Sequence, residues 1–162
     1  MISKKMAKAL NEQINAELYS AYLYLSMSAY ASAHGFKGTA KWLAVQNKEE
    51  TTHAMKQYGY LLSQGEQPEM DAIAKPPVTF KSPLDVFEQT LQHEQGVTRR
   101  INKLVDMAAA ENDHATGIFL QWFVTEQVEE EENATEVVNM LKVAGSDKVA
   151  MFMVDGHLGK RE

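Results

Sequence analysis

The chain has 162 residues, of which 44% are hydrophobic and 23% are charged, as is typical of one globular domain with a substantial core. Its 16 lysines and arginines against 22 aspartates and glutamates give a formal net charge of -6, which offers no basis for binding nucleic acid. The absence of cysteine excludes disulfides, thiolate zinc sites, iron–sulfur clusters and cysteine nucleophiles. No secretory signal and no run of membrane-spanning length is recognisable, so we expect a cytoplasmic protein without a membrane segment.

The first part of the chain predicts two long helices. Apolar residues recur every three or four positions from about Ser3 to Ala33, with Ser3 as the N-cap. A short break around Gly35 precedes a second helix, expected from about Thr39 to Ser63. Because the connection between them is short, the two helices are expected to pack antiparallel.

Residues 64–82 hold Pro68, Pro76 and Pro77, three of the four prolines, and predict an irregular connection. A helix of about 28 residues is about 42 Å long, and about 18 extended residues reach at most about 60 Å. The connection is therefore long enough to cross the bundle from end to end. The third helix is then expected to run parallel to the second.

Three further helices are expected in the rest of the chain. The third begins after Ser82-Pro83, an N-cap followed by proline in the first turn. After a turn at residues 111–114, the fourth helix runs to about Val143, and a short last helix spans about 147–158. The predicted fold is all-α. It comprises a four-helix bundle over about residues 3–143, with the crossover at about 64–82 and a short fifth helix, in one domain over residues 1–162.

One glutamate interrupts the apolar stripe near the middle of each long helix: Glu17, Glu50, Glu94 and Glu130. At matched depth the four carboxylates meet in one cavity and carry a charge of about -4 if all are ionised. A single such glutamate is more readily explained as a residue whose long side chain extends until its carboxylate reaches solvent. Four together favour a metal site, because buried carboxylates are costly unless cations neutralise them.

Two nitrogen-bearing or amide neighbours accompany these carboxylates. His53 follows Glu50 by three residues and Gln127 precedes Glu130 by three, so each pair shares one helix face. Carboxylate oxygens with one imidazole suit iron(II), manganese or zinc and suit copper(I) poorly.

In type, order and spacing these residues match the ferroxidase residues of ferritins. Over essentially its whole length the chain resembles the bacterial non-haem ferritins, which are ferritin-like four-helix bundles. The resemblance implies that Glu17, Glu50 and His53 hold one iron, with Glu50 bridging. It implies that Glu94 and Glu130 hold a second iron.

The same resemblance implies roles for two neighbouring side chains. Gln127 is expected to hydrogen-bond into the site. Tyr24, seven residues after Glu17 on the same face, matches a tyrosine that lies beside the iron pair and can supply an electron, although packing in the core explains it equally well. Trp122, at a similar level, is better explained by packing.

Glutamates also crowd the fourth helix at positions 126 and 129–132, without a lysine or arginine nearby in sequence. Such a run is usually a solvated face, but like charges three residues apart destabilise a helix. Bacterial ferritins resemble this region and use the matching residues as a third iron site. Here those residues are Glu49, Glu126, Glu129 and Glu130, whereas Glu131 and Glu132 are expected on the surface.

The chain departs from two related families. Bacterioferritins repeat the Glu-x-x-His pair on the fourth helix, where this chain has Gln127-Val128-Glu129-Glu130. They also place a haem-ligating methionine after the second-helix glutamate, where this chain has Thr51. We therefore expect no haem. Rubrerythrin-like relatives add a cysteine-held iron domain, which this chain cannot build.

The resemblance implies an iron storage protein with ferroxidase activity. Two Fe(II) ions are expected to be oxidised by dioxygen or peroxide, and the ferric mineral to collect inside a hollow homo-oligomer of 24 subunits, with the fifth helix as a candidate contact around the four-fold axis. Two alternatives stay open. One is a di-iron or di-manganese oxidase or peroxidase without storage. The other is a metal-free interaction bundle, in which an apolar residue at position 50 or 53 would raise stability.

Overall fold

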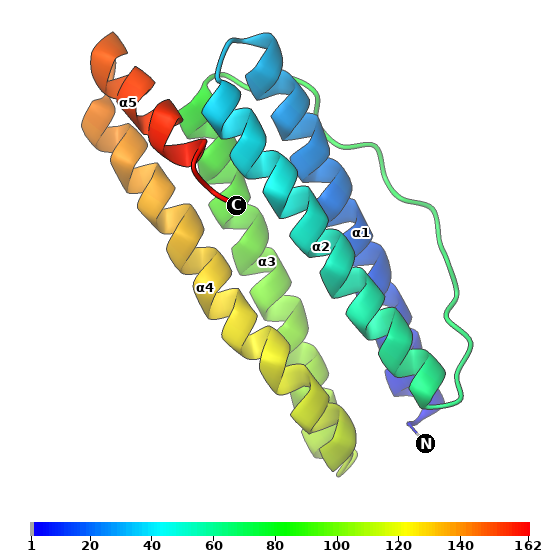
Figure 1. The fold of residues 1–162 in the computed structure, drawn as a ribbon. Coiled ribbons are helices and arrows are strands. Elements are labelled where there is room, and N and C mark those ends of the chain that lie inside the picture. Colours follow the sequence, from blue (N-terminus) through cyan, green and yellow to red (C-terminus); the bar gives the residue numbers. More distant parts are fainter. Residues whose placement is uncertain (1) are drawn as a thin grey trace.

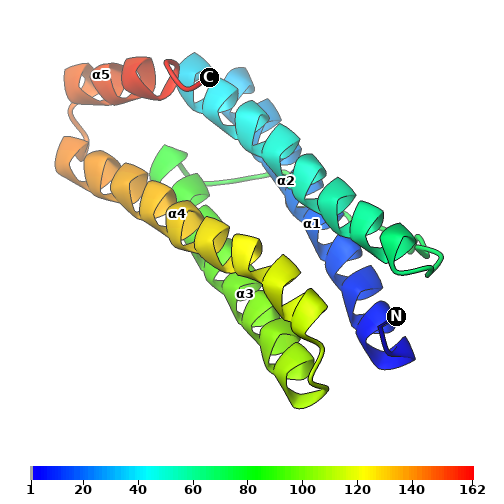
Figure 2. The ribbon, with the colours of Figure 1, turned by 60° about the horizontal axis from the view of Figure 1, so that its bottom comes forward.

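The computed structural model describes residues 2–162, and all regular structure within them is helical. Four long helices run side by side, and a short fifth lies across one end of the bundle (Figures 1 and 2). The helices are α1 (Lys4–Ala33), α2 (Lys37–Ser63), α3 (Pro83–Ala110), α4 (His114–Ala144) and α5 (Lys148–Leu158). The predicted all-α bundle with a short fifth helix is confirmed. Within residues 2–162, every helix is too short or too polar to span a bilayer.

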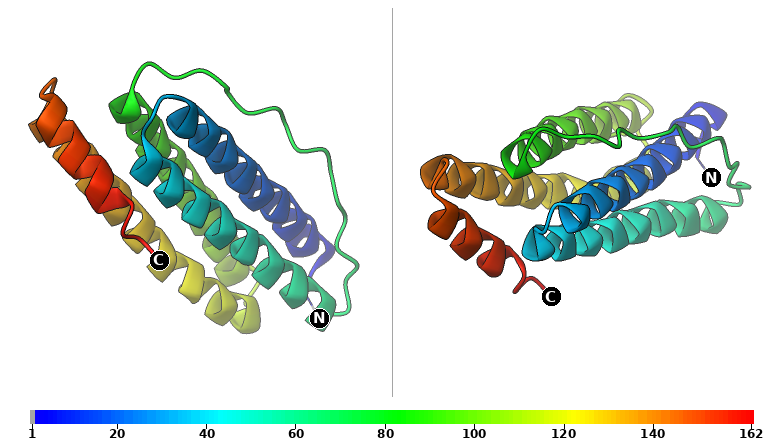
Figure 3. Two further views of the ribbon diagram at one scale, coloured as in Figure 1. Left: turned by 45° about the horizontal axis from the view of Figure 1, so that its top comes forward. Right: turned by 90° about the horizontal axis from the view of Figure 1, so that it is seen from above.

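The connection between α2 and α3 runs along the outside of the bundle. Figures 1 and 3 show that residues 64–82 leave the end of α2 and travel beside α1 to the other end, where α3 begins. Side chains of α1 hold this segment by its backbone. Asn15 Nδ2 donates to the carbonyl oxygens of Asp71 and Ala72 (3.3 and 3.1 Å), and Ser26 Oγ donates to that of Pro77 (2.6 Å). As predicted, α3 runs parallel to α2, and each short connection joins an antiparallel pair.

Side-chain caps fix where the helices begin. Ser3 Oγ accepts a hydrogen bond from the Met6 amide (3.0 Å), and Ser82 Oγ accepts one from the Asp85 amide (3.1 Å), as the sequence predicted for α1 and α3. Gly35 ends the first helix with a φ of 88°, a left-handed conformation that favours glycine.

The second helix begins at Lys37, two residues before the predicted Thr39. Its first turn is capped from a distance by α5, because the Asp155 carboxylate accepts hydrogen bonds from the backbone amides of Gly38 (2.9 Å) and Thr39 (2.8 Å). A Cβ added at Gly38 would lie 1.7 Å from the Asp155 carbonyl oxygen. The contact between α2 and α5 therefore depends on glycine at position 38.

The core consists of two apolar clusters with a polar layer between them. In α1, Leu10 and Ile14 belong to one cluster, Tyr24 and Met27 belong to the other, and Glu17 lies between them. The other three long helices repeat this order, with buried polar residues within 46–53, 90–94 and 127–130 separating the apolar residues of the two clusters. Apolar burial on both sides stabilises the bundle by about 25 cal/mol per Å², and so holds the polar layer in place.

Replacing Gly38 with alanine is expected to destabilise the protein by about 1–3 kcal/mol, because the added methyl group overpacks against the backbone of α5. Gly59 provides the matched control in the same helix. A Cβ there meets nothing within 4 Å, so Gly59→Ala should stabilise α2 by about 0.5–1 kcal/mol through helix propensity. Thermal unfolding followed by circular dichroism measures both changes. Equal effects of the two substitutions would contradict the close packing of α2 on α5.

Candidate metal centre

A layer of polar side chains crosses the middle of the bundle. Each long helix contributes one glutamate to this layer, and none of the four is more than 4% exposed: Glu17, Glu50, Glu94 and Glu130. His53 and Gln127, one turn away from Glu50 and Glu130, are buried as well. The inward direction expected for these six side chains is observed, and the alternative in which the glutamates reach solvent is wrong. Their role as metal ligands stays a prediction.

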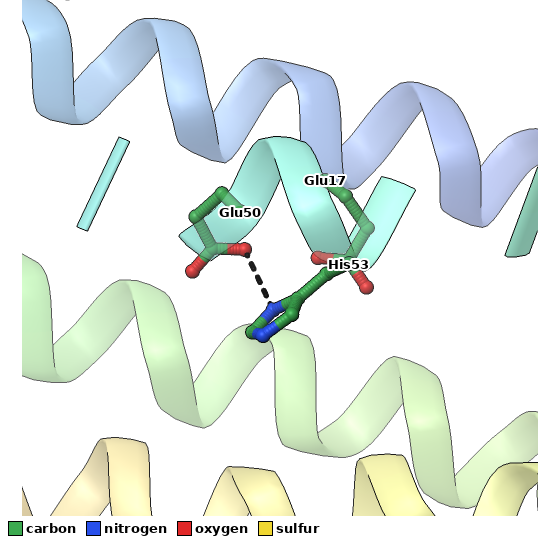
Figure 4. Close-up of side chains that lie close together, drawn as sticks. All are labelled: Glu17, Glu50 and His53. Carbon is green, nitrogen blue, oxygen red and sulfur yellow. Dashed lines mark ion pairs between the residues drawn. The ribbon is translucent and has the colours of Figure 1, made fainter. Parts of the chain in front are cut away.

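Glu17, Glu50 and His53 form the first cluster. Each offers one possible ligand atom, and these atoms all lie within 4.8 Å of one another. Figure 4 shows Glu17 facing the Glu50–His53 pair, in which Nδ1 of His53 lies 3.4 Å from Oε2 of Glu50. The Oε2 atoms of Glu17 and Glu50 are buried and accept no hydrogen bond from any residue between 2 and 162. Two such oxygens without donors are costly, and a cation between them would satisfy both, so these residues fit a metal ion.

His53, Glu126 and Glu130 form a second cluster whose ligand atoms also lie within 4.8 Å of one another. The Nε2 atom of His53 lies 3.7 Å from Glu126 Oε1, so the imidazole presents one nitrogen to each cluster. This arrangement differs from the sequence prediction, which placed His53 in the di-iron site alone.

Hydrogen-bond donors already occupy both oxygens of Glu94. The Tyr24 hydroxyl donates to Oε1, and Gln127 Nε2 donates to Oε2 (3.2 Å). Within residues 2–162, Glu94 belongs to neither cluster. Its predicted role as a ligand of the second metal ion therefore stays a prediction. Tyr24 is completely buried, packs in an apolar cluster and has a satisfied hydroxyl, so the structure is compatible with both roles considered for it.

The residues predicted for a third iron site are spread along the edge of the layer. Glu126 is half-buried, Glu129 is exposed, and Glu49 pairs with Arg161, whose Nη2 lies 2.5 Å from Glu49 Oε2. Burial raises the pKa of both Glu49 and Glu126, and the charge of Glu129 adds to each shift. Arg161 opposes the shift of Glu49 more strongly than Glu129 adds to it. These carboxylates thus share one electrostatic environment, but an arginine already balances one of them.

Burial raises the pKa of the glutamates in the layer. Desolvation raises the pKa of Glu17 to about 7 and that of Glu130 to about 8, and the charge of Glu94 adds to both shifts. Desolvation followed by the charges of the neighbouring glutamates also holds the pKa of Glu50 well above its ordinary value. Without a cation, the layer therefore retains protons near neutral pH.

The imidazole of His53 responds in the opposite direction. Burial, followed by the charge of Lys56, lowers its pKa to about 4, so the ring is neutral at physiological pH. A neutral imidazole has a free lone pair and is the form that binds metals. Trp122 packs edge-on against this ring, with the ring centroids 5.3 Å apart, and Lys56 covers the indole. These contacts support the packing role expected for Trp122.

Four polar residues of the layer and its edge were missed in the sequence. Gln13, Gln46 and Gln57 are at most 1% exposed. Gln13 and Gln57 both donate to Oε1 of Glu17 (3.0 Å each), and Gln46 donates to Oε2 of Glu130 (2.6 Å). A local signal existed for two of them, since Gln13 and Gln46 each precede a predicted ligand by four residues on the same helix face. Arg161, which donates to Gln46 and Glu49, had no such signal.

Comparison with known proteins finds one family throughout the chain. The ferritin family, described as a ferritin-like domain, matches residues 7–143. A bacterial non-heme ferritin from Bacteroides fragilis is 45% identical over 161 residues, covering 99% of this chain and 100% of the relative. One from Staphylococcus aureus is 38% identical over 161 residues, covering 99% and 97%. Among solved structures, an open-pore ferritin from the archaeon Archaeoglobus fulgidus superposes with a TM-score of 0.99 at 48% identity and full coverage of both chains.

The raised pKa values of the glutamates predict how the stability of the metal-free protein depends on pH. Glu17 and Glu130, with pKa values of about 7 and about 8, stay protonated in the folded state where the unfolded chain has released the proton. The unfolded state then binds fewer protons, so stability falls as pH rises. Between pH 7.5 and 8.5, where histidines are neutral in both the folded and the unfolded state, the melting temperature should fall by a few degrees, at about 2–4 °C per kcal/mol lost.

Two controls accompany this measurement by scanning calorimetry. A Glu17→Gln, Glu130→Gln variant should lose the part of the pH dependence that these two residues contribute, because its amides do not titrate, and the remainder belongs to Glu50, whose pKa is also raised. Saturation with Zn(II) should remove the fall in the wild-type protein, since the bound ion favours the ionised carboxylates. A melting temperature of the metal-free protein that rises over this range would contradict the prediction.

Proposed function

The chain belongs to the ferritin family, and from this premise we propose that it is an iron storage protein that oxidises its own cargo. Fe(II) is the substrate. It is oxidised by dioxygen or peroxide inside each subunit, and the ferric product is stored as mineral within a hollow shell. The observation that carries the proposal is the pair of buried carboxylate oxygens on Glu17 and Glu50 that receive no hydrogen bond from the described part of the chain.

The proposed ligands divide between two iron positions. Glu17, Glu50 and His53 hold the first Fe(II), with Glu50 shared between the two ions. Glu94 and Glu130 hold the second. The short separations within the Glu17, Glu50 and His53 cluster support the first position, and its mixed oxygen and imidazole donors suit Fe(II).

The residues around the pocket prepare these ligands for a doubly charged ion. Binding of Fe(II) displaces the protons that Glu17 and Glu130 retain near neutral pH, and their negative charge then stabilises the ferric product. Gln127 and Tyr24 hold Glu94 by its two oxygens and fix its orientation. Each iron gives up one electron to the oxidant, and the Tyr24 hydroxyl, hydrogen-bonded to Glu94, lies where it can supply another.

Storage requires subunits to enclose a space, and the surface offers apolar residues for contacts between them. Val143 at the end of α4 is 90% exposed, and on α5 Val149, Phe152 and Met153 are 69–80% exposed. Water-exposed apolar side chains in one region favour burial against other subunits. A shell of 24 subunits in the cytoplasm, with α5 at the four-fold contact, is the assembly that we propose.

A third iron position is proposed at the edge of the pocket, on Glu49, Glu126, Glu129 and Glu130. The nearness of Glu126 to His53 and Glu130 supports it. Ferric ions that leave the two inner positions can pass through this outer site on their way to the mineral. Because Arg161 pairs with Glu49, an ion at this position has to share that carboxylate with the guanidinium.

Aerobic addition of Fe(II) tests the proposed activity directly. The wild-type protein should produce ferric absorbance rapidly and form large particles that retain iron. Glu50→Gln removes a ligand shared by both ions and should slow oxidation by about 100-fold or more, since even groups that only support a ligand cost about 10–100-fold. Glu132→Gln, at an exposed position of α4, is the control and should oxidise iron normally.

Particle mass and bound iron distinguish this proposal from its rivals. Rapid oxidation by a small oligomer that keeps no mineral would indicate an oxidase or peroxidase. A protein that binds no iron and gains stability from Glu50→Leu would indicate a bundle without metal. Either result would overturn iron storage as the function.

Anaerobic titration with Fe(II) tests the third position. The wild-type protein should bind three ions per subunit, and a Glu126→Ala, Glu129→Ala variant should bind two, because both removed carboxylates serve only the outer position. Glu132→Ala, Glu136→Ala removes the same charge from exposed positions of the same helix and should still bind three. A Glu126→Ala, Glu129→Ala variant that retains three ions would rule out this site.

A further inference from the structure

Two carboxylates of the pocket are each held by a glutamine, and each glutamine is in turn held by an arginine. At one edge, Arg161 Nη1 donates to Gln46 Oε1 (2.7 Å), and Gln46 Nε2 donates to Glu130 Oε2 (2.6 Å). At another, Arg100 Nε donates to Gln13 Oε1 (2.9 Å), and Gln13 Nε2 donates to Glu17 Oε1 (3.0 Å). The same order of groups thus occurs twice, built from different helices.

The chemistry of the two outer groups fixes how each amide is turned. A guanidinium donates hydrogen bonds and accepts none, whereas an ionised carboxylate only accepts. The amide oxygen must therefore face the arginine and the amide nitrogen must face the glutamate. A reversed amide would place an oxygen against the carboxylate and a nitrogen against the guanidinium. Gln13 and Gln46 are at most 1% exposed, so in the intact structure their amides meet these partners and not bulk water.

Arg161 reaches its place from beyond the last helix. Its guanidinium lies over the ring of Trp42, 4.2 Å from the centroid, and also binds Glu49. The side chain is 20% exposed despite its position after α5. Three contacts to α2 therefore hold the end of the chain against the pocket. Arg100 is anchored in a similar way, since its Nη2 donates to the backbone oxygen of Glu12 (3.0 Å).

We infer that Arg100 and Arg161 are positioning residues for the metal pocket, each of which orients a glutamine so that the glutamine holds one metal-binding carboxylate in place. The inference rests on the proposed function, because Glu17 and Glu130 are the proposed ligands of the two different ions. Each arginine favours cation binding through the fixed amide, even though its own charge repels a cation.

Charge and orientation predict opposite changes in cation affinity when one of these arginines is removed. Removing a positive charge near a cation site should strengthen binding if charge alone matters. Removing an arginine that orients the amide should weaken binding, because the freed glutamine no longer fixes the carboxylate. Loss of a group that supports a metal ligand typically costs about 10–100-fold in affinity. We therefore expect Arg161→Ala to weaken binding by about tenfold and Arg100→Ala to weaken it less, because Gln57 still donates to Glu17 when Gln13 is freed.

Titration of the assembled protein with Co(II) tests this inference without relying on iron oxidation. Co(II) stays divalent under air in such a site, and its visible absorption reports both affinity and coordination. Lys160→Ala and Arg99→Ala are the matched controls, because each removes a neighbouring charge that donates to neither glutamine. These two variants should bind Co(II) as tightly as the wild-type protein, or slightly more tightly.

Gln46→Met separates orientation from packing. The thioether side chain keeps a similar length and volume, but it can neither accept from Arg161 nor donate to Glu130. Its Co(II) affinity should fall as far as that of Arg161→Ala, with the same change in absorption. Combining Gln46→Ala with Arg161→Ala should cost little more than either alone, since both break one chain of hydrogen bonds.

The outcomes distinguish the inference from the function on which it rests. A wild-type protein that binds no Co(II) and oxidises no Fe(II) would overturn both. A wild-type protein that binds Co(II) normally, with Arg161→Ala binding equally or more tightly, would overturn the inference and leave the function standing. Arg161 lies outside every helix, so its replacement decides the question even if Arg100→Ala fails to assemble.

Discussion

Burial of four glutamates in the middle of the bundle is the constraint on which the rest of the structure depends. Carboxylates at that depth must be protonated, hydrogen-bonded or neutralised by a cation. The protein supplies amide and hydroxyl donors to Glu17, Glu94 and Glu130, yet leaves one oxygen each of Glu17 and Glu50 without a donor. Within the described residues Glu50 therefore depends on a proton or a cation for its neutralisation, whereas the other three glutamates each accept at least one hydrogen bond.

The architecture follows from the need to hold such a layer against its own repulsion. Each long helix extends far enough on both sides of the layer to bury an apolar cluster above it and another below it. The crossover is hydrogen-bonded to α1, and α5 is hydrogen-bonded to the start of α2. These two segments therefore link helices that no short connection joins.

Sequence predicted the parts of this arrangement that local chemistry determines. Ser3 and Ser82 marked helix starts because a side-chain cap acts within three residues, and Glu17 stood out because a charge is rare in an apolar stripe. Gln13 lies on the same helix face one turn before Glu17, but a neutral amide is a weaker signal than a charge, so it was missed. The early start of α2 and the position of Arg161 depend on contacts between residues more than 100 positions apart, which no local pattern encodes.

The two arginine–glutamine pairs reconcile opposing requirements of a cation pocket. Glu130 must be held in a fixed orientation, and a charged donor such as Arg161 would hold it most firmly. Direct contact would also cancel the negative charge that attracts the cation. With Gln46 between them, the guanidinium fixes the direction of the amide while the carboxylate meets only a neutral donor. Because Coulomb energy falls with distance, the arginine transmits orientation to the pocket at a small cost in the attraction that the pocket exerts on a cation.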